Sequence, residues 1–184
     1  MSQPDLDDVV ALYATWAGHN YDEQVSQLDH ARQTAALAVS AGASDALIAA
    51  ALLHDIGHLL HLADIGDAAV EMSVDLQHEH AGAGYLSAIF PVAVTAPIAL
   101  HVEAKRYRCS VDPTEVGRLS EGSRRSLERQ GGPMSLDERV AFEGEPHQID
   151  AVGLRGWDDA GKIEGGLDIA PFESYLDLLA SLST

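Results

Sequence analysis

A histidine–aspartate pair stands inside the most apolar segment of this chain, and any fold must give that pair partners. The segment reads Ala49-Ala-Ala-Leu-Leu-His-Asp-Ile-Gly-His58, so His54 and Asp55 directly follow two leucines. Burying these polar groups among leucines costs several kcal/mol unless they are paired or bound to a metal. His58 and His61 lie four and seven residues after His54, which places the three histidines on one helix face. An ordinary core histidine explains one of them, whereas a metal site explains all three with the acid.

The spacing of apolar residues predicts α-helices along almost the whole chain. Apolar positions recur at helical spacing over residues 9–16 and 28–39, after which Gly42 is suited to a C-cap. Ser44 is suited to cap one very apolar helix that runs through residue 60. Further helices are expected over residues 78–90, 91–107, 113–130, 146–160 and 171–179. Strand-like alternation is scarce, so the sequence predicts an all-α domain.

Glycine, proline and serine positions add detail to this prediction. Gly82 and Gly84, inside one expected helix, indicate close packing or close approach to a site. Pro97 lies inside another expected helix and predicts a kink or a break. Residues 135–138, Ser-Leu-Asp-Glu, match a capping box. The chain has no internal repeat and no linker-like stretch, so we expect a single domain over residues 1–184.

The composition excludes several classes of protein. A chain of 184 residues with 46% hydrophobic residues suits one soluble globular domain. The longest apolar run, residues 46–53, is shorter than the ~18 residues of a membrane helix, and the first residues lack the basic stretch of a secretory signal. The single cysteine, Cys109, allows no internal disulfide and no all-cysteine zinc site. We therefore expect a cytoplasmic enzyme or binding protein that does not bind membranes.

The charge is strongly negative but unevenly distributed. The net charge of −18 argues against binding to nucleic acids or anionic membranes. Arg32 is the only basic residue among the first 100, and the other ten lie between Lys105 and Lys162. Such a concentrated basic segment is able to hold a small anion, and it is equally typical of a solvated helix face.

Candidate metal ligands occur on several of the expected helices. Histidine is the commonest protein metal ligand, and helical bundles commonly build metal sites from side chains on facing helices. Six residues combine a ligand side chain with apolar neighbours or a place on an apolar helix: His30, His54, Asp55, His78, His101 and Asp158. A nitrogen-and-oxygen set without thiolate suits iron, manganese or zinc. If two ions bind, Asp55 is the natural bridge between them.

These residues carry a family resemblance. The order His30, His54-Asp55, Asp158 resembles the H…HD…D signature of HD-domain proteins. Longer segments resemble the PhnZ-like phosphonate dioxygenases, and the resemblance spans about residues 20–162. These segments are Gln24-Val-Ser-Gln-Leu-Asp-His30, His54-Asp-Ile-Gly-His58, Leu100-His-Val-Glu-Ala-Lys-Arg-Tyr107, Gln130-Gly-Gly-Pro-Met134 and Leu154-Arg-Gly-Trp-Asp-Asp159. The resemblance implies a single HD-type helical bundle with a buried dinuclear metal site.

The resemblance also implies an activity, that of a mixed-valent di-iron oxygenase. Such enzymes use O2 to cleave the C–P bond of a small 1-hydroxyphosphonate, of the 2-amino-1-hydroxyethylphosphonate type or N-methylated, giving phosphate and a carboxylic acid such as glycine. The resemblance implies a mixed-valent pair of irons, Fe2+ and Fe3+. One iron is held by His30, His54 and Asp158. The other is held by His78 and His101, and Asp55 bridges the two. His80 competes with His78, which we prefer because His78-Glu-His-Ala-Gly-Ala83 matches the His-Glu-x-x-Gly-Ala run of the family.

The residues around these ligands indicate an anion site. Lys105 follows His101 by four residues and so shares its helix face, where a positive charge suits an anion bound to the metal. His58 has the same relation to His54, and we expect both side chains to hold phosphonate oxygens. An exposed lysine at a helix end is the alternative for Lys105. Three polar residues are weaker candidates for the same oxygens: Ser123, Ser126 and Gln130.

The family resemblance places an acid opposite the substrate's amino group. Glu23, seven residues before His30, occupies that position. The family often has a tyrosine three residues before the acid, where this chain has Asn20, with Tyr21 beside it. The substituent on the phosphonate is therefore left open, as is the oligomeric state.

Two other functions compete with the oxygenase. In an HD-type phosphohydrolase, a metal-bound hydroxide attacks a phosphate ester or nucleotide and no O2 is needed. A regulatory domain would bind metal without turnover. Lys105 and the turn at residues 130–132 favour an enzyme, because a sensor has no need of an anion site.

Overall fold

The computed structural model describes residues 3–19, 25–65, 77–164 and 169–184. These parts form α-helices and two short 3₁₀ helices and contain no β-strand, which confirms the predicted all-α class. The α-helices are α1 (Leu6–Trp16), α2 (Gln27–Ser40), α3 (Asp45–Leu53), α4 (Ile56–Ile65), α5 (His78–Leu86), α6 (Val92–Val111), α7 (Glu121–Arg129), α8 (Leu136–Glu143), α9 (Gln148–Ala160) and α10 (Leu176–Leu182). The 3₁₀ helices are η1 (Pro113–Gly117) and η2 (Phe172–Tyr175).

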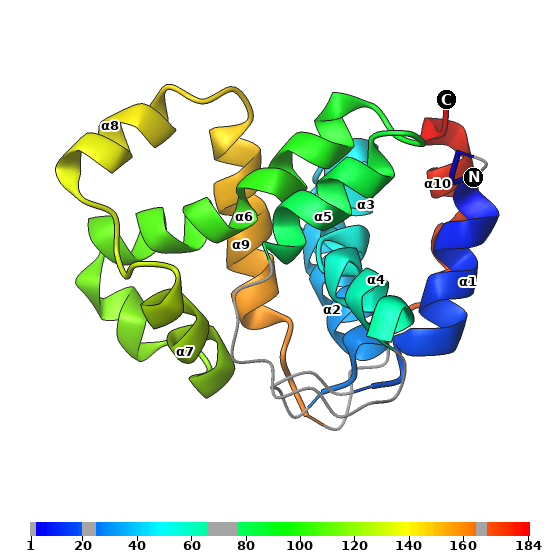
Figure 1. The fold of residues 1–184 in the computed structure, drawn as a ribbon, viewed down its shortest axis with the longest axis horizontal. Helices are drawn as coiled ribbons and strands as arrows, with labels where there is room; N and C mark the ends of the chain where they lie inside the picture. The colour runs from blue at the N-terminus through cyan, green and yellow to red at the C-terminus, as the bar shows by residue number, and fades with distance from the viewer. Residues whose placement is uncertain (1–2, 20–24, 66–76, 165–168) are drawn as a thin grey trace.

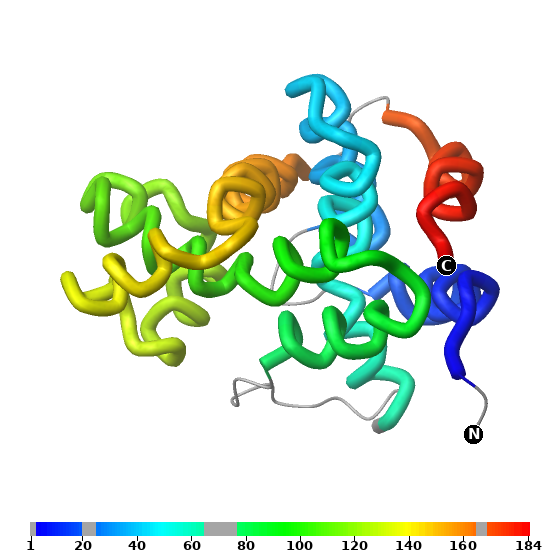
Figure 2. The backbone as a smooth tube through the Cα atoms, turned by 90° about the horizontal axis from the view of Figure 1, so that it is seen from above, coloured from blue at the N-terminus to red at the C-terminus, as the bar shows by residue number. Residues whose placement is uncertain are grey.

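The helices form a bundle with a smaller lobe at one end. The first and last helices, α1 and α10, lie side by side at one end of the molecule (Figure 1; Figure 2). Helices α7 and α8 form the lobe on the other side of α9 (Figure 1). The long helix α6 packs extensively against α9, α5 and α3, so it joins the bundle to the lobe. Ligands from helices far apart in sequence therefore meet where α6 and α9 cross the bundle.

Local capping explains many of the helix boundaries. Ser44 accepts a hydrogen bond from the Leu47 amide at the start of α3, as its position predicts. The expected capping box at residues 135–138 is present at the start of α8. Gly42 follows α2 with a φ of +69°, a conformation that glycine adopts without strain.

The expected single helix over residues 44–60 is wrong in one respect, because it is interrupted at the histidine–aspartate pair. Helix α3 ends at Leu53 and α4 begins at Ile56. The His54 ring donates from Nδ1 to the Ala51 carbonyl at 2.9 Å, so the side chain occupies a carbonyl that would otherwise accept a hydrogen bond within the helix.

The segment Asp45–Asp64 is long and apolar enough to cross a membrane by length and composition alone, although its longest uninterrupted apolar run is shorter. Since 56% of its most apolar window is buried inside the protein, the composition is that of a core segment.

Other boundaries also differ from the expected ones. The polar helix expected over residues 113–130 is divided into η1 and α7, because Ser120 caps a new helix start. Helix α5 ends at Leu86, short of residue 90, and α6 continues to Val111. Pro97 lies within α6 without breaking it. The helices expected from residues 146 and 171 form with shifted ends, the second of them as η2 followed by α10.

Close backbone approach joins α4 to α5. A Cβ atom on Gly57 would lie 2.0 Å from the His78 carbonyl oxygen, and one on Gly82 would lie 3.1 Å from the Gly57 amide nitrogen. The prediction of close packing is therefore confirmed for Gly82, but it is wrong for Gly84, around which a Cβ would meet open space. This contact brings the start of α5 against the α3–α4 junction, so that His78 lies beside Asp55.

Candidate metal centre

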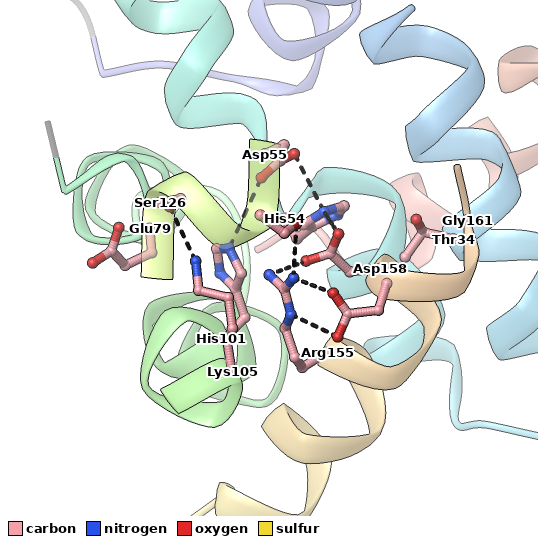
Figure 3. A network of polar contacts seen from close by, with 12 residues as sticks. Thr34, His54, Asp55, Glu79, His101, Lys105, Ser126, Arg155, Asp158 and Gly161 are labelled. Carbon is pink, nitrogen blue, oxygen red and sulfur yellow. Dashed lines mark hydrogen bonds and ion pairs between the residues drawn. The ribbon is translucent and has the colours of Figure 1, made fainter. Parts of the chain in front are cut away.

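Six side chains from five places in the fold converge in the interior. These side chains are His30 on α2, His54 and Asp55 at the α3–α4 junction, His78 at the start of α5, His101 on α6 and Asp158 on α9. Several of them are seen pointing toward one another in Figure 3. All six are the ligands predicted from the sequence, and they form two clusters of donor atoms that share Asp55.

The first donor cluster consists of His30, His54, Asp55 and Asp158. The Nε2 atoms of His30 and His54 lie 3.2 Å apart. Both face Asp55 Oδ2, at 3.5 Å from His30 and 3.4 Å from His54. Asp158 Oδ1 completes the group at 3.2 Å from His30 Nε2. Two imidazole nitrogens and two carboxylate oxygens thus surround one point.

The second donor cluster consists of Asp55, His78 and His101. The Nε2 atoms of the two histidines lie 3.2 Å apart. The other oxygen of the shared carboxylate, Asp55 Oδ1, lies 3.4 Å from His78 Nε2 and 3.9 Å from His101 Nε2. Asp55 therefore turns one oxygen to each cluster, which is the arrangement required of a bridge.

Backbone carbonyls fix which ring nitrogen carries the proton. Three histidines donate Nδ1–H to a carbonyl: His30 to Gly161 at 2.9 Å, His54 to Ala51 at 2.9 Å and His101 to Ile98 at 2.7 Å. Their Nε2 atoms therefore present lone pairs to the clusters. Lone pairs and carboxylate oxygens at such separations repel one another unless a cation lies among them. The donor set thus fits two metal ions of the kind that bind nitrogen and oxygen.

Burial and neighbouring charges set the protonation of the histidines. Burial, followed by the nearby His78, holds the pKa of His101 well below its usual value. Burial also lowers the pKa of His54. Burial also acts to lower the pKa of His30. The hydrogen bond and charge of Asp158 outweigh burial there, so the pKa of His30 is raised. The neutral imidazoles of His54 and His101 are the form that binds metal.

The two carboxylates are ionised despite their burial. Burial alone would raise the pKa of Asp158, but Arg155 and Lys162 hold that pKa well below its usual range. Burial likewise acts to raise the pKa of Asp55, and the imidazoles beside it lower that pKa well below normal. Both carboxylates therefore remain negative in the interior, where cations are needed to balance their charge.

Lys105 lies in the interior beside these clusters. Only 3% of its surface is exposed, which excludes the alternative of an exposed lysine at a helix end. Its Nζ donates to Ser126 Oγ at 3.0 Å, from α6 across to α7 (Figure 3). Burial, together with the charge of Arg155, lowers the pKa of Lys105 to about 7. This buried ammonium one turn after His101 has the position that an anion site requires.

The other polar candidates on α7 also face inward. Ser123 is buried, and its Oγ accepts from Arg155 Nη2 at 3.2 Å and from Lys162 Nζ at 2.9 Å. Gln130 ends α7, and its buried Oε1 has no hydrogen-bond partner among the described residues. A buried amide oxygen in this state is suited to meet a ligand or water.

The remaining histidines differ in how deeply they are buried and in how close they lie to the donor clusters. His80 is exposed, with 57% of its side chain accessible, so the structure brings His78 and not His80 to the centre. The His58 ring stacks on that of His78 with centroids 3.9 Å apart. His58 Nε2 lies 4.0 Å from Asp55 Oδ1, and His58 forms with Asp55 and His78 a group of side chains that could hold a metal ion. His61 lies further along α4, and Glu23, Asn20 and Tyr21 lie outside the described residues.

The structure adds three residues that the sequence argument missed. Arg155, buried on α9, pairs through Nη1 with Asp158 Oδ2 at 2.6 Å and also binds Asp159. Lys162 Nζ lies 3.2 Å from Asp158 Oδ1. Glu79, next to His78, is buried as well. The spacing of Arg155 from the two aspartates, three and four residues, was the available signal.

Comparisons with known proteins agree with this geometry. The family model described as "HD domain" matches residues 28–142. The hydroxymethylphosphonate dioxygenase of Gimesia maris is 43% identical over 178 residues, which cover 95% of this chain and 88% of that protein. The [1-hydroxy-2-(trimethylamino)ethyl]phosphonate dioxygenase (glycine-betaine-forming) of Leisingera caerulea is 40% identical over 140 residues, 76% of this chain and 70% of that protein. The first similarity covers nearly the whole chain and therefore includes the residues that build the two donor clusters.

Proposed function

This chain belongs to the HD-domain family, among its PhnZ-like oxygenases, and from that premise we propose that it uses O2 to cleave the C–P bond of a small 1-hydroxyphosphonate. The reaction R–CH(OH)–PO3H2 + O2 → R–COOH + H3PO4 balances without a further reductant. The carbon next to phosphorus is oxidised to a carboxylic acid, and O2 is reduced as its two atoms enter the products. A substrate with an amino or trimethylammonio group would give glycine or its N-methylated analogue.

The observation that carries the proposal is the buried Lys105 beside a donor set for two metals. A hydrolase and an oxygenase both need metal ions, and a phosphonate or phosphate group on the substrate needs a further cation next to them. Lys105 supplies that cation one turn from His101, and Ser126 holds its Nζ at 3.0 Å. Both relatives are named as dioxygenases of phosphonates, which favours O2 chemistry over hydrolysis.

The donor clusters would hold two iron ions, in the Fe2+ and Fe3+ states. The first cluster offers His30, His54 and Asp158, the second offers His78 and His101, and Asp55 is shared. When bound, iron supplies the one-electron chemistry that O2 requires.

The protein groups bind and orient the substrate. The Lys105 ammonium and the His58 ring would hold phosphonate oxygens from two sides, with help from Ser123, Ser126 and Gln130. A dianionic group close to Lys105 would raise its pKa again and keep the ammonium charged. Glu23 would face an amino group on the substrate.

Phosphate release with and without O2 tests the proposal. Protein loaded with iron would be given hydroxymethylphosphonate, 2-amino-1-hydroxyethylphosphonate and its trimethylammonio analogue, with phosphate and O2 followed together. We expect at least one of them to give one phosphate for each O2 consumed and none under strict anaerobiosis. Equal phosphate release without O2, from these or from phosphate esters, would overturn the oxygenase in favour of the HD-type phosphohydrolase.

A further inference from the structure

One histidine of the centre differs from the others in what supports its ring. His30, His54 and His101 donate their Nδ1–H to uncharged backbone carbonyls. His78 Nδ1 instead lies 3.4 Å from a carboxylate oxygen, Oε2 of Glu79. Because His78 Nε2 faces Asp55 and His101, its Nδ1 is the nitrogen that remains to hold the proton.

Glu79 is an unusual residue to find in the interior. Only 5% of its surface is exposed, and its buried Oε2 has no partner with full hydrogen-bond geometry in the described part of the chain. Within the ranges that the structure describes, the basic groups within 4.0 Å of its carboxylate oxygens are imidazoles, His78 at 3.4 Å and His80 at 4.0 Å. A buried carboxylate without a cationic partner is costly, and the His78 N–H is the group placed to offset that cost.

We propose that Glu79 is a positioning residue, which accepts a hydrogen bond from the Nδ1–H group of His78 and thereby strengthens metal binding at the second donor cluster. The inference rests on the proposed function, because it requires a metal ion at that cluster. A carboxylate behind a ligand histidine fixes its ring and increases the electron density that Nε2 donates. The added negative charge favours a trivalent ion over a divalent one, since the interaction grows with the charge of the ion.

The first donor cluster has the opposite surroundings. Its carboxylate, Asp158, is paired with two cations, Arg155 at 2.6 Å and Lys162 at 3.2 Å. These cations withdraw charge from that ligand, whereas Glu79 adds charge to His78. The two clusters use similar ligands, so the difference between them comes from residues that do not touch the metal.

Two substitutions separate the charge of Glu79 from its hydrogen bond. Glu79→Gln keeps an oxygen acceptor of the same size without the charge, and Glu79→Ala removes both. Metal-free protein would be titrated anaerobically with Fe2+ while the number of ions bound and the affinity for each are followed. We expect two ions in the unmodified protein. In Glu79→Gln we expect a 10–100-fold weaker second ion with the first unchanged, the usual effect of losing such a support.

The reduction potential of the loaded protein gives a second readout that a merely structural role would not move. If the affinity for Fe3+ falls tenfold more than that for Fe2+, the potential rises by about 59 mV. Glu173→Gln, an exposed change on η2, is the matched control and should alter neither affinity nor potential. Thermal unfolding of each metal-free variant checks that the fold is retained.

The possible results distinguish this inference from the proposed function. If Glu79→Gln keeps its second ion and its potential, or if only Glu79→Ala weakens binding, the role of the charge is overturned. Equal loss of both ions in Glu79→Gln would also overturn it, because the effect would not be confined to one cluster. Failure of the unmodified protein to bind a second ion would overturn the dinuclear centre itself, and this inference with it.

Discussion

Arg155 forms an ion pair with Asp158, one turn later on the same helix, with its Nη1 2.6 Å from Asp158 Oδ2. The pair is buried, and it leaves the other oxygen, Oδ1, to face His30 Nε2 at 3.2 Å. Arg155 thus determines which oxygen of Asp158 is presented to the first donor cluster. The guanidinium also binds Asp159 and Ser123, so its orientation is itself fixed by the fold.

Arg155→Ala should therefore destabilise the protein and weaken metal binding. Removing one member of a buried pair costs about 3–5 kcal/mol, because the other charge is left without compensation. Denaturant unfolding of the metal-free protein measures this loss. Arg118→Ala, at a position with 68% of the side chain exposed, is the control and should cost no more than about 1 kcal/mol. A similar loss in both variants would contradict the role given to Arg155.

Asp55→Ala should lose both metal ions together, because the two clusters share this carboxylate. Metal analysis of protein purified from cells grown with iron checks the expectation, with two irons per chain in the unmodified protein. Asp177→Ala, an exposed change on α10, should keep both. A full metal content in Asp55→Ala would refute the bridging assignment.

Lys105→Ala should keep its metal and lose substrate affinity. A hydrogen bond to a charged group contributes about 1.5–3 kcal/mol, which corresponds to a loss of roughly tenfold to a hundredfold. Steady-state kinetics should place the effect mainly in KM, and Lys105→Arg should restore it only in part because a guanidinium has a different shape. A change in kcat/KM below about twofold, as for an ordinary surface substitution, would remove the anion site from the mechanism.

The pKa of Lys105, lowered to about 7 by burial and Arg155, predicts a pH dependence. Below that pH the ammonium is charged in the free enzyme and attracts the phosphonate, and above it the neutral amine no longer does. The ratio of kcat/KM between the unmodified protein and Lys105→Ala should therefore fall as the pH rises through about 7. Taking the ratio cancels the titration of the substrate. A ratio that is constant between pH 6 and 9 would be inconsistent with this role.

Gly57→Ala should disturb the second donor cluster through the backbone. The added Cβ would lie 2.0 Å from the His78 carbonyl, so α4 and α5 must separate. We expect lower stability and a weaker second ion, measured by unfolding and by metal titration. Gly84→Ala is the matched control, since a Cβ there meets nothing within 4 Å, and it should be neutral or more stable by about 0.5–1 kcal/mol. Equal behaviour of the two variants would argue against the close contact.

Local spacing and residue type are enough to predict the all-α class, most of the helices and the six residues that converge. Helix periods and caps depend on neighbours a few residues away, as at Ser44 and Ser135. The six candidate ligands are predicted by residue type, spacing and the resemblance to HD-domain proteins, because several histidines and aspartates on apolar helices need partners or a metal. The break at His54 was not predicted, since it depends on that side chain taking the Ala51 carbonyl.

How these residues act together depends on contacts that exist once the chain has folded. His30 donates to the carbonyl of Gly161, a residue 131 positions away, and this contact sets the ring nitrogen that faces the cluster. Lys105 likewise has a distant partner, since its Nζ donates a hydrogen bond to Ser126 Oγ on α7, 21 positions away. The support that Glu79 and Arg155 give to neighbouring ligands depends on which side of each helix faces the interior. The contacts of His30 with Gly161 and of Lys105 with Ser126 join segments far apart in the chain, and no local pattern of residues specifies them.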